Sequence, residues 1–322
     1  MRTDEIFSNL FRPSAGVRQG CILSPLLFNC YTELIMRIVL EDWDDGISIG
    51  GKKVTNLRYA DDTVLFATSI QNIENLLRRV EDVSLDFGLK INRNKTKMMI
   101  VDRVNKNSPG ILQIANCAVV SSYIYLGAQI SNNGGSMNEI MRRIAIARSA
   151  LEKLNKVWKN RDITKANKVR LMKALVFSIF LYAAETWTLR ESKKTKIYAF
   201  EMWCWRKMLG VSWTEFRTNQ SILQELQIEQ RLSDIVRMRI LTYFGHISRR
   251  GNDSIERLMV QGTVNGTRAR GRSPTRWADQ IKSAVGLPLH ACSRQAEVRG
   301  EWRRIVKRTS TIMTTTTALA RG

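Results

Sequence analysis

Two stretches near the start of the chain repeat their apolar residues at helical spacing. The first begins at Ser24, which suits an N-cap, followed by Pro25, which suits the first helical position. The second begins at Thr68, with Gln71 three residues later as in a capping box, and stops at Gly88. The apolar positions are Leu27, Tyr31, Leu34, Ile35 and Ile38 in the first, and Ile73, Leu76, Leu77, Val80, Val83 and Phe87 in the second. Two amphipathic helices are predicted.

Short runs of strand-forming residues separate these helices. Residues 47–49 and 54–59 are rich in β-branched and apolar side chains, and Gly50 with Gly51 forms a turn signal between them. Short strands alternating with helices over residues 16–130 predict an α+β domain. We place this first domain at residues 1–135.

The pattern becomes almost wholly helical after residue 137. Helices are predicted at about 164–188, at 192–209 with Gly210 as the stop, and at 229–245. A further helix carries Ile140, Ile144, Ala147, Leu151 and Leu154. A helical domain is therefore expected over residues 136–250.

The last part of the chain, residues 251–322, has a different texture. Gly, Arg, Ser and Thr dominate it, and residues 314–322 are low in complexity. We expect a basic tail that is partly disordered, with the last ten or so residues unfolded.

The net charge of the chain limits the kinds of molecule that it is expected to bind. Lys and Arg number 51 against 29 Asp and Glu, so the formal net charge is +22 and the pI is about 10.2. Such an excess favours polyanions, with nucleic acid ahead of an anionic membrane surface. The basic residues do not align on one face of a continuous amphipathic helix, so a membrane-surface protein is the weaker reading.

The cysteines indicate a reducing compartment. Cys21, Cys30, Cys117, Cys204 and Cys292 are scattered and odd in number, and they form no CxxC pair. With two histidines in the whole chain, a Cys/His zinc site of familiar spacing cannot be assembled, and we predict no zinc.

Targeting segments are not expected. The first residues lack the apolar core of a signal peptide, and the most apolar stretch, 175–184, has about half the roughly 20 residues that span a bilayer. We expect a soluble intracellular protein with no membrane partner, in the nucleus or the cytoplasm.

Candidate chemistry lies at an Asp pair. Residues 56–67 consist of two strand-like runs that meet at Asp61 and Asp62. Two carboxylates at a hairpin tip suit capture of a hard divalent cation such as Mg²⁺. Asp is also a common turn former, so a hairpin without metal chemistry has the same composition.

Further segments, which follow one another in a fixed order, support the interpretation of the Asp pair as a metal-binding site. Residues 16–29, Gly-Val-Arg-Gln-Gly-Cys-Ile-Leu-Ser-Pro-Leu-Leu-Phe-Asn, form a glycine loop before a Pro-containing helix. In this loop Gly20 permits close backbone approach to a ligand, and Arg18 and Gln19 supply donors beside it. Residues 88–96, which contain Lys95, and the tripeptide at 125–127, Tyr-Leu-Gly, follow the Asp pair.

Together these segments resemble the LINE-type (non-LTR retrotransposon) endonuclease-reverse transcriptases from motif B onward. The resemblance implies a partial palm, an antiparallel sheet with packed helices, followed by a thumb-like helical domain. It implies Asp61 as the firmer metal ligand, Asp62 as its auxiliary and Lys95 as proton donor to pyrophosphate. It also implies that Arg18, Gln19, Gly20 and Tyr59 face the nucleotide.

The resemblance further implies the partners and the ion. They are an RNA template, a DNA primer, dNTP once the palm is complete, and Mg²⁺ with Mn²⁺ as a substitute. The similarity continues through Thr186-Trp187-Thr188-Leu189, Phe244-Gly245-His246 and residues 266–277. Simpler interpretations stay open for two of these segments. The segment around Lys95 could be only a charged turn, and residues 125–127 could be only the end of a strand entering a turn.

The pattern departs from the family at its start. The first metal-binding Asp of the family lies in motif A, tens of residues before motif B, whereas fifteen residues precede Gly16 here. Asp4 and Glu5 lie in no such motif. We therefore expect the chain alone to be inactive, and its palm to present an unpaired strand edge.

The basic segment suggests binding of single-stranded nucleic acid. Arg268, Arg270, Arg272 and Arg276 stand beside Trp277, which combines phosphate-pairing charge with a ring on which a base can stack. A solvated basic tail is the simpler reading. The Trp and Met residues at Trp158, Trp203 and Met208 are expected in the core.

Two other functions stay open. A non-catalytic nucleic-acid-binding remnant of a retroelement accounts for the charge without polymerisation. A viral RNA-dependent RNA polymerase is the weaker rival, because those enzymes usually carry Gly where Ala60 precedes the Asp pair.

Overall fold

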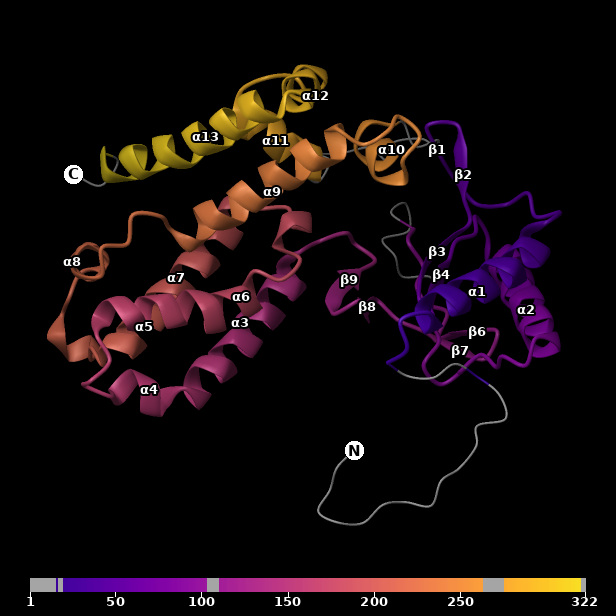
Figure 1. Ribbon diagram of the computed structural model, residues 1–322, viewed down its shortest axis with the longest axis horizontal. Helices are drawn as coiled ribbons and strands as arrows, with labels where there is room; N and C mark the ends of the chain where they lie inside the picture. Colours follow the sequence, from indigo (N-terminus) through magenta and orange to yellow (C-terminus); the bar gives the residue numbers. More distant parts are fainter. Residues whose placement is uncertain (1–15, 17–19, 103–109, 263–274, 320–322) are drawn as a thin grey trace, which may run out of the picture. The chain divides into compact units, whose positions relative to one another are not determined.

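A computed structural model describes residues 16, 20–102, 110–262 and 275–319, and within them the chain is α+β and mostly helical. It divides into two compact units, one of residues 1–96 and 113–118 and the other of residues 97–112 and 119–322. Figure 1 labels the elements of both. Arg18, Gln19, Arg268, Arg270 and Arg272, named above as candidate binding residues, lie outside the described residues.

The first unit packs two helices beside short antiparallel hairpins. Its elements are α1 (Ser24–Leu40), β1 (Ile47–Ile49), β2 (Lys52–Val54), β3 (Asn56–Tyr59), β4 (Asp62–Leu65), α2 (Ile70–Asp86), β6 (Gln113–Ile114) and most of β7 (Cys117–Val119). Buried Ile35 and Val39 of α1 meet Leu76 of α2 in a small core, against which Leu65 of β4 also packs. This core holds the Asp-bearing hairpin against the helix pair.

The local signals for α1 and α2 are nearly those predicted. Ser24 is the first residue of α1 rather than its cap, since the N-cap is Leu23 without a side-chain hydrogen bond. The cap of α2 is Ser69, whose side chain accepts from the N–H of Asn72. Thr68, the predicted cap, instead donates its hydroxyl to Oδ1 of Asp45 over 2.6 Å. A tertiary partner has displaced the N-cap by one residue, from Thr68 to Ser69.

The second unit contains β5 (Lys97–Met98), the hairpin β8 (Ser122–Tyr125) and β9 (Ala128–Ser131), and a large helical array. The helices of the array are α3 (Met137–Lys153), α4 (Asn155–Lys159), α5 (Lys165–Leu171), the π-helical turn η1 (Met172–Phe177), α6 (Ser178–Phe180), the 3-10 turn η2 (Ala184–Thr186), α7 (Glu191–Leu209), η3 (Trp213–Glu215), α8 (Asn219–Glu225), α9 (Leu232–Ser248), α10 (Ile255–Gln261), α11 (Trp277–Val285), α12 (Leu289–Glu297) and α13 (Arg299–Leu319). One hydrophobic cluster runs through most of it. Trp158 and Met208 are buried there and Trp203 packs against it, which confirms them as core residues.

The predicted helix over 164–188 is wrong beyond Phe180. Thr164 does cap α5, and η1 and α6 carry the helical path on to Phe180. The chain then turns at Ala183, whose φ is +56°. Arg239 of α9 donates to the carbonyl of Leu181 over 2.8 Å, so a tertiary hydrogen bond takes an acceptor that a continuing helix would use. In contrast α7 ends at Gly210 as predicted, with φ +70°.

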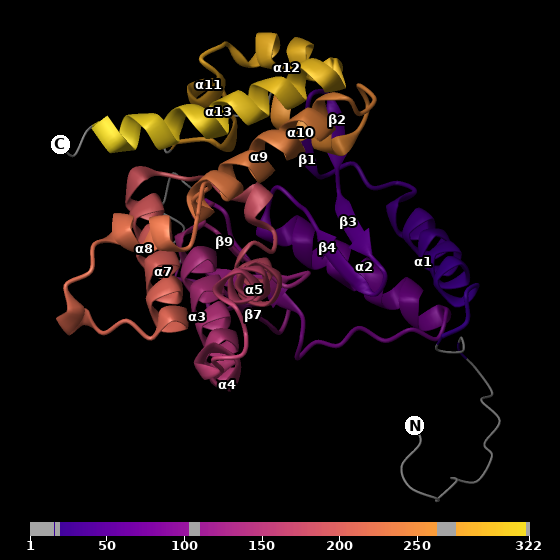
Figure 2. The ribbon, with the colours of Figure 1, turned by 60° about the vertical axis from the view of Figure 1, so that its left-hand side comes forward.

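The predicted stop at Gly245 is also wrong. Helix α9 runs through this glycine to Ser248, and α13 lies along it (Figure 2). A Cβ at position 245 would lie 2.3 Å from Cδ1 of Trp302, and the Trp302 indole donates to the carbonyl of Leu241 over 2.8 Å. The glycine serves close packing of two helices rather than a helix end.

Residues after 250 share the core of the helical array. Ile281, Cys292, Ala296, Trp302 and Val306 are buried in the same cluster as α3, α7 and α9. The expected boundary at residue 250 therefore does not coincide with an edge of the core. Helix α13 also extends to Leu319, into the stretch expected to be unfolded.

Two further observations concern composition. Cys21, Cys30, Cys117, Cys204 and Cys292 are all free, and the first two are exposed. Among the described helices, none combines the length and apolar character needed to cross a membrane.

Candidate active site at the Asp61–Asp62 hairpin

The Asp pair occupies the tip of a tight β-hairpin. Strands β3 and β4 pair antiparallel with Tyr59 opposite Asp62, which leaves Ala60 and Asp61 as the two-residue turn. Ala60 has φ +53°, in the left-handed region that non-glycine residues seldom enter. Such a turn reverses the chain within two residues, so both carboxylates stand at the end of the hairpin.

The surroundings of the tip are open. Asp61 and Asp62 are exposed, and Tyr59 beside them has 65% of its surface exposed. Strands β3 and β4 form a two-stranded sheet, so within the described residues each has one unpaired edge. Two oxygen-rich side chains with free access are a fit for Mg²⁺, which proteins commonly bind through one or two carboxylates together with substrate phosphates.

An ion pair that the sequence pattern did not indicate holds this hairpin to α1. Nη2 of Arg58 on β3 lies 2.6 Å from Oε2 of Glu33, and Nη1 of the same guanidinium donates to the carbonyl of Thr32 over 3.3 Å. Hydrogen bonds from Arg37 and then from Arg58 hold the pKa of Glu33 below its usual value. Arg58 stands two residues before Ala60, so the contact joins the end of the hairpin near the turn to α1. The sequence feature from which this ion pair could have been inferred is an arginine in the middle of a short strand.

The glycine loop before α1 is described only in part. Gly20 has φ +86°, and a Cβ placed there would meet no atom of the described residues within 4 Å. The glycine is thus required by its backbone angle, and open space lies beside it. Arg18 and Gln19, predicted as donors here, stay predictions because they lie outside the described residues.

Lys95 lies on an exposed turn that is tied to α2. Its backbone N–H donates to the carbonyl of Asn92 over 3.1 Å. Two residues earlier Arg93 forms a two-point ion pair with Glu81 of α2 and donates to the carbonyl of Ala115 over 3.0 Å. The Arg93 hydrogen bond holds the pKa of Glu81 below its usual value. Arg93, which sequence reasoning also missed, therefore fixes the turn that carries Lys95.

The described candidate residues of the partial palm belong to one unit, and their assembly into a site stays a prediction. Gly20, Tyr59, Asp61, Asp62 and Lys95 all belong to the first unit. Across the ranges that the structure describes, no group of three or more His, Cys, Asp or Glu residues could hold a metal ion, so the hairpin offers a pair of carboxylates. Arg276 and Trp277, the described members of the predicted nucleic-acid segment, belong to the second unit.

Trp277 makes structural contacts that the sequence did not indicate. Its indole N–H donates to the carbonyl of Glu185 over 2.9 Å, and its ring lies 6.1 Å from that of Tyr243 and 6.4 Å from that of Phe244. The ring is half-buried against the helical core. Stacking on a base stays a prediction for the exposed part of the ring. Arg276 just before it is exposed at the N-cap of α11.

The turn at residues 125–127 is held by the helical unit. Leu126 and Gly127, with φ +46° and +75°, form the two-residue turn between β8 and β9. Both Arg142 and Arg143 of α3 donate to the carbonyl of Gly127, and the hydroxyl of Tyr182 donates to that of Leu126 over 2.7 Å. Three side chains therefore determine the position of a turn two residues long.

The amino-acid sequence of the chain is similar to those of known proteins. Residues 6–130 match the family described as reverse transcriptase (RNA-dependent DNA polymerase). The Pol polyprotein of the type-1 retrotransposable element R2 of Nasonia vitripennis is 31% identical over 134 residues, which is 38% of this chain and 13% of the polyprotein. That of the type-2 element R2DM of Drosophila melanogaster is 32% identical over 117 residues, 36% of this chain and 11% of the polyprotein. The resemblance to LINE-type reverse transcriptases is confirmed.

A third relative extends the similarity beyond the reverse-transcriptase segment. A transposon-derived protein of Caenorhabditis elegans is 28% identical over 280 residues, which cover 82% of this chain and 99% of that protein. The similarity to this relative therefore extends over most of both chains. The two R2 polyproteins are much longer than the segment they share with it.

Proposed function

We propose that this chain supplies the downstream part of an RNA-directed DNA polymerase of the non-LTR retrotransposon type. Residues 1–135 act as a partial palm with motifs B to E, residues 136–250 as a thumb-like and connection region, and residues 251–322 as a basic region. The observation that carries the proposal is the position of Asp61 and Asp62, exposed together at the tip of the β3–β4 hairpin. The reverse-transcriptase match over residues 6–130 contains that hairpin.

The carboxylates would hold Mg²⁺ for nucleotidyl transfer. When bound, a pair of such ions activates the attacking primer hydroxyl and stabilises the charge on the leaving pyrophosphate. Asp61 at the turn is the main ligand in this proposal, and Asp62 on β4 is its auxiliary. The Arg58–Glu33 ion pair keeps the hairpin at a set place on α1, so the two carboxylates present a stable geometry.

The remaining residues act on substrate. Gly20, with open space beside its Cα, lets the backbone approach the nucleotide, and Arg18 and Gln19 supply donors there. Tyr59 borders the carboxylates and faces the nucleotide from the hairpin. Lys95 transfers a proton to pyrophosphate as the bond to the leaving oxygen breaks. Arg93 holds the turn of Lys95 to α2 and acts as a positioning residue.

A third carboxylate from the motif A strand of the family completes the site in this proposal. Two features support a further strand beside the hairpin. Among the described residues the outer edges of β3 and β4 have no strand partner. The apolar side chains of Leu26, Leu27 and Leu34 on α1 are also about half exposed or more, at 60%, 58% and 49%. We therefore expect the 322-residue chain by itself not to extend a primer.

The test compares the chain with a fusion that carries the fingers and motif A segment of a relative ahead of Gly16. Each is incubated with primed poly(rA), dTTP and Mg²⁺ or Mn²⁺. The fusion should synthesise DNA, and the chain alone should not. Strong incorporation by the chain alone, lost in Asp61→Ala, would contradict the need for a third carboxylate.

Variants within the fusion separate the roles. Asp61→Asn should abolish synthesis and leave primer-template binding intact, because the amide keeps the shape but loses the charge. Lys95→Ala should slow nucleotide addition by about 10²-fold or more, the usual range for general acid catalysis. Asp86→Asn and Lys90→Ala, exposed charges of the same unit, are the matched controls and should change neither. A folded fusion that binds primer-template but never incorporates dNTP would favour the second function.

That second function is a nucleic-acid-binding protein without catalysis, and the observation that favours it is the net charge of +22. Binding of a single strand should then weaken by about 0.7 log units per log unit of salt for each phosphate neutralised. Replacing Arg268, Arg270, Arg272 and Arg276 by Ala should reduce that slope. A binding constant indifferent to salt and to these changes would point to another kind of partner.

A further inference from the structure

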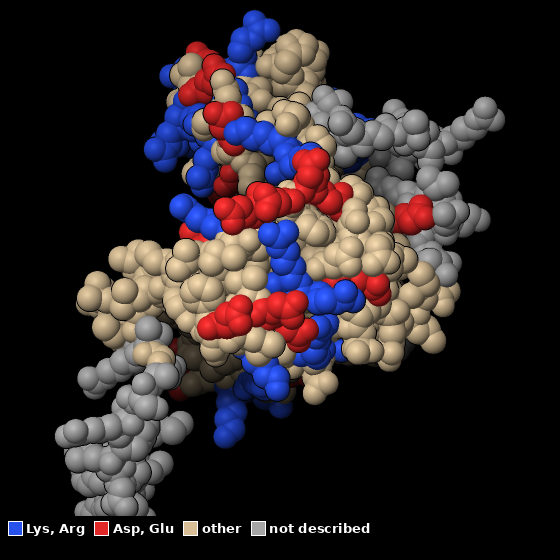
Figure 3. Space-filling view, turned by 90° about the vertical axis from the view of Figure 1, so that its right-hand side faces the viewer, with Lys and Arg blue, Asp and Glu red and all other residues tan. Residues whose placement is uncertain are grey.

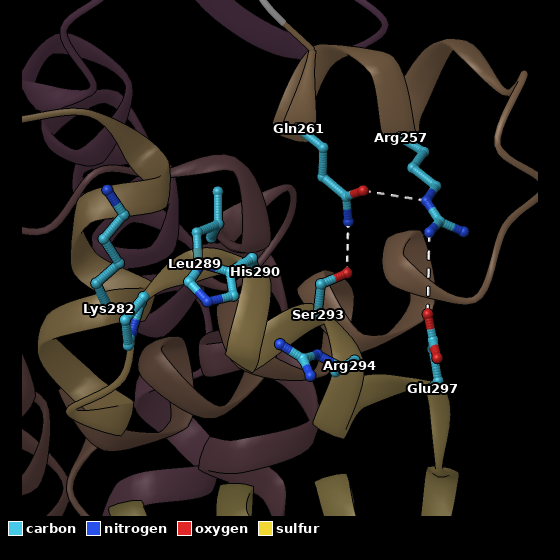
Figure 4. A pocket seen from close by; sticks show the side chains of 9 residues that line it. Arg257, Gln261, Lys282, Leu289, His290, Ser293, Arg294 and Glu297 are labelled. Carbon is cyan, nitrogen blue, oxygen red and sulfur yellow. Dashed lines mark hydrogen bonds and ion pairs between the residues drawn. The ribbon is translucent and has the colours of Figure 1, made fainter.

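A hollow of about 670 Å³ lies among the helices α10, α11 and α12 of the second unit. Figure 4 shows Arg257 and Gln261 reaching it from α10, with Ser293, Arg294 and Glu297 on α12. Lys282 of α11 lines the same hollow, as do Pro288 and His290. Its volume falls within the range of small-molecule pockets, about 300 to 1,000 Å³, and so suits one or two nucleotide units rather than a duplex.

The rim of the hollow is positively charged. Arg257, Lys282 and Arg294 carry three permanent positive charges, and Glu297 is the single carboxylate among the lining residues. Figure 3 shows Lys and Arg side chains over the upper part of one face of the molecule, with some Asp and Glu between them. A concave surface with more positive than negative side chains concentrates a positive electrostatic potential, which attracts an anion.

The internal ion pairs leave much of this charge available. Nζ of Lys282 is 3.6 Å from Asp279 with both side chains more than 40% exposed, and Arg257 is 4.0 Å from a half-exposed Glu297. Arg257 is 20% exposed, but an ion pair in which at least one group is about half exposed contributes little energy at such distances, so a phosphate can displace both carboxylates. Within the part of the chain that the structure describes, Arg294 makes no ion pair.

Arg257 is nevertheless held in one orientation. Its Nε donates to Oε1 of Gln261 over 3.1 Å, and Nη1 donates to the carbonyl of Arg250 over 2.9 Å. Gln261 is in turn fixed, because its amide donates to Oγ of Ser293 over 2.6 Å. The Nη2 group lies 4.0 Å from Oε1 of Glu297, too far for a hydrogen bond, so a phosphate that displaces this carboxylate can accept from its N–H groups. A guanidinium oriented in advance loses little entropy when it binds a phosphate.

One wall of the hollow is apolar. Pro288 and Leu289 lie where α11 turns into α12, after Gly286 with φ +79°. The carbonyl of Pro288 accepts from the N–H of Ala291 and of Cys292, each over 3.0 Å, which fixes the start of α12. An apolar wall opposite oriented cations suits a chain of alternating sugar or base and phosphate better than a free inorganic anion.

We propose that this hollow binds the phosphodiester backbone of single-stranded nucleic acid, with Arg257, Lys282 and Arg294 as the phosphate contacts. The inference rests on the proposed function for its class of ligand. It adds a site in the second unit that consists of described residues alone and does not depend on the arginines at 268–272. The hollow and the arginines at 268–272 are neighbours in the sequence, since α10 precedes these arginines and α11 follows them.

The test uses the full chain with a fluorescein-labelled 12-nucleotide oligo(dT) and follows anisotropy over a range of salt. The triple variant Arg257→Gln, Lys282→Gln, Arg294→Gln should weaken binding at about 0.1 M salt by about tenfold or more. It should also lower the salt slope by about 2, from about 0.7 for each of three phosphates. The matched control, Lys153→Gln, Lys159→Gln, Arg170→Gln, removes the same charge from exposed sites of the same unit. It should change affinity by less than about threefold.

Cross-linking of the unaltered chain gives a second measurement that does not depend on a variant folding. Photo-cross-linked oligo(dT) should map to residues 255–261 and 282–297. Equal losses in both triple variants, or cross-links confined to other residues, overturn the proposal. So does tighter binding to anionic phospholipid vesicles than to oligo(dT). Primer extension by the fusion is measured separately, so a failure of this site leaves the polymerase proposal standing or falling by its own test.

Discussion

Nε of Arg143 donates to Oε1 of Glu139 over 2.7 Å, and this buried ion pair lies where α3 meets the β8–β9 turn. The other carboxylate oxygen accepts from Arg142 and from the N–H of Gln129, each over 2.8 Å. Burial alone would raise the pKa of Glu139, but these hydrogen bonds outweigh it and hold the pKa below its usual value. The pair thus connects the helical array to the turn that its arginines also bind.

Glu139→Gln should lower the free energy of unfolding of the chain by about 2 to 4 kcal/mol, because it leaves two arginines with one buried neutral partner. A carboxyl whose pKa is lowered on folding stabilises the protein above its unfolded pKa of about 4.3, and this stability is lost as the pH falls through the folded value. Urea unfolding at pH 7 and at about pH 3 measures both effects. The variant should lose less stability than the parent between these two values, and an identical loss would show that Glu139 is not linked to acid unfolding.

Gly245→Ala should destabilise the helical array by about 1 to 3 kcal/mol, since its Cβ would lie 2.3 Å from the buried Trp302 ring. The rigid indole cannot move aside without losing its hydrogen bond to Leu241. Gly251→Ala is the control, because a Cβ there meets nothing within 4 Å. Thermal unfolding followed by circular dichroism compares the two. Equal melting temperatures would mean that α9 and α13 approach less closely than described.

Alkylation should distinguish the cysteines. Cys21 and Cys30 are exposed and should react with iodoacetamide in the folded chain, while Cys117, Cys204 and Cys292 should react after unfolding. Hydrogen bonds from the backbone of Leu23, then from Ser24, lower the pKa of Cys21, whereas burial raises that of Cys204 and of Cys292. More thiolate at neutral pH makes Cys21 the faster site. Mass spectrometry of tryptic peptides over time measures this order, and early modification of Cys204 would contradict it.

Trp277→Ala should reduce stability by about 3 kcal/mol or more, because it removes a large packed ring and the hydrogen bond to Glu185. Arg276→Ala, at the exposed neighbouring position, should leave stability within about 0.5 kcal/mol and weaken oligonucleotide binding instead. Urea unfolding and anisotropy separate the two effects. If Trp277→Leu restores stability but not binding, the aromatic ring of Trp277 also stacks on a base.

The sequence by itself determined the features that depend on neighbours a few residues apart. Periodicity located α1, α2 and α7, and Gly210 ended α7 as expected because a left-handed residue suits glycine. The strand-like runs around Asp61 and Asp62 already placed both carboxylates at a hairpin tip, because a two-residue turn leaves no other place for them. The motif order from Gly16 to Gly127 was enough to indicate the family.

Tertiary structure decided what depends on partners far along the chain. Arg58 pairs with a carboxylate 25 residues away, and Trp277 donates to a carbonyl 92 residues away. The helix expected to continue past Phe180 ends where Arg239 takes the carbonyl of Leu181, and Gly245 continues a helix because Trp302 packs against it. Local propensities differ by less than about 1 kcal/mol per residue, whereas a buried hydrogen bond or steric clash is worth as much or more, so these long-range contacts overrule the local pattern.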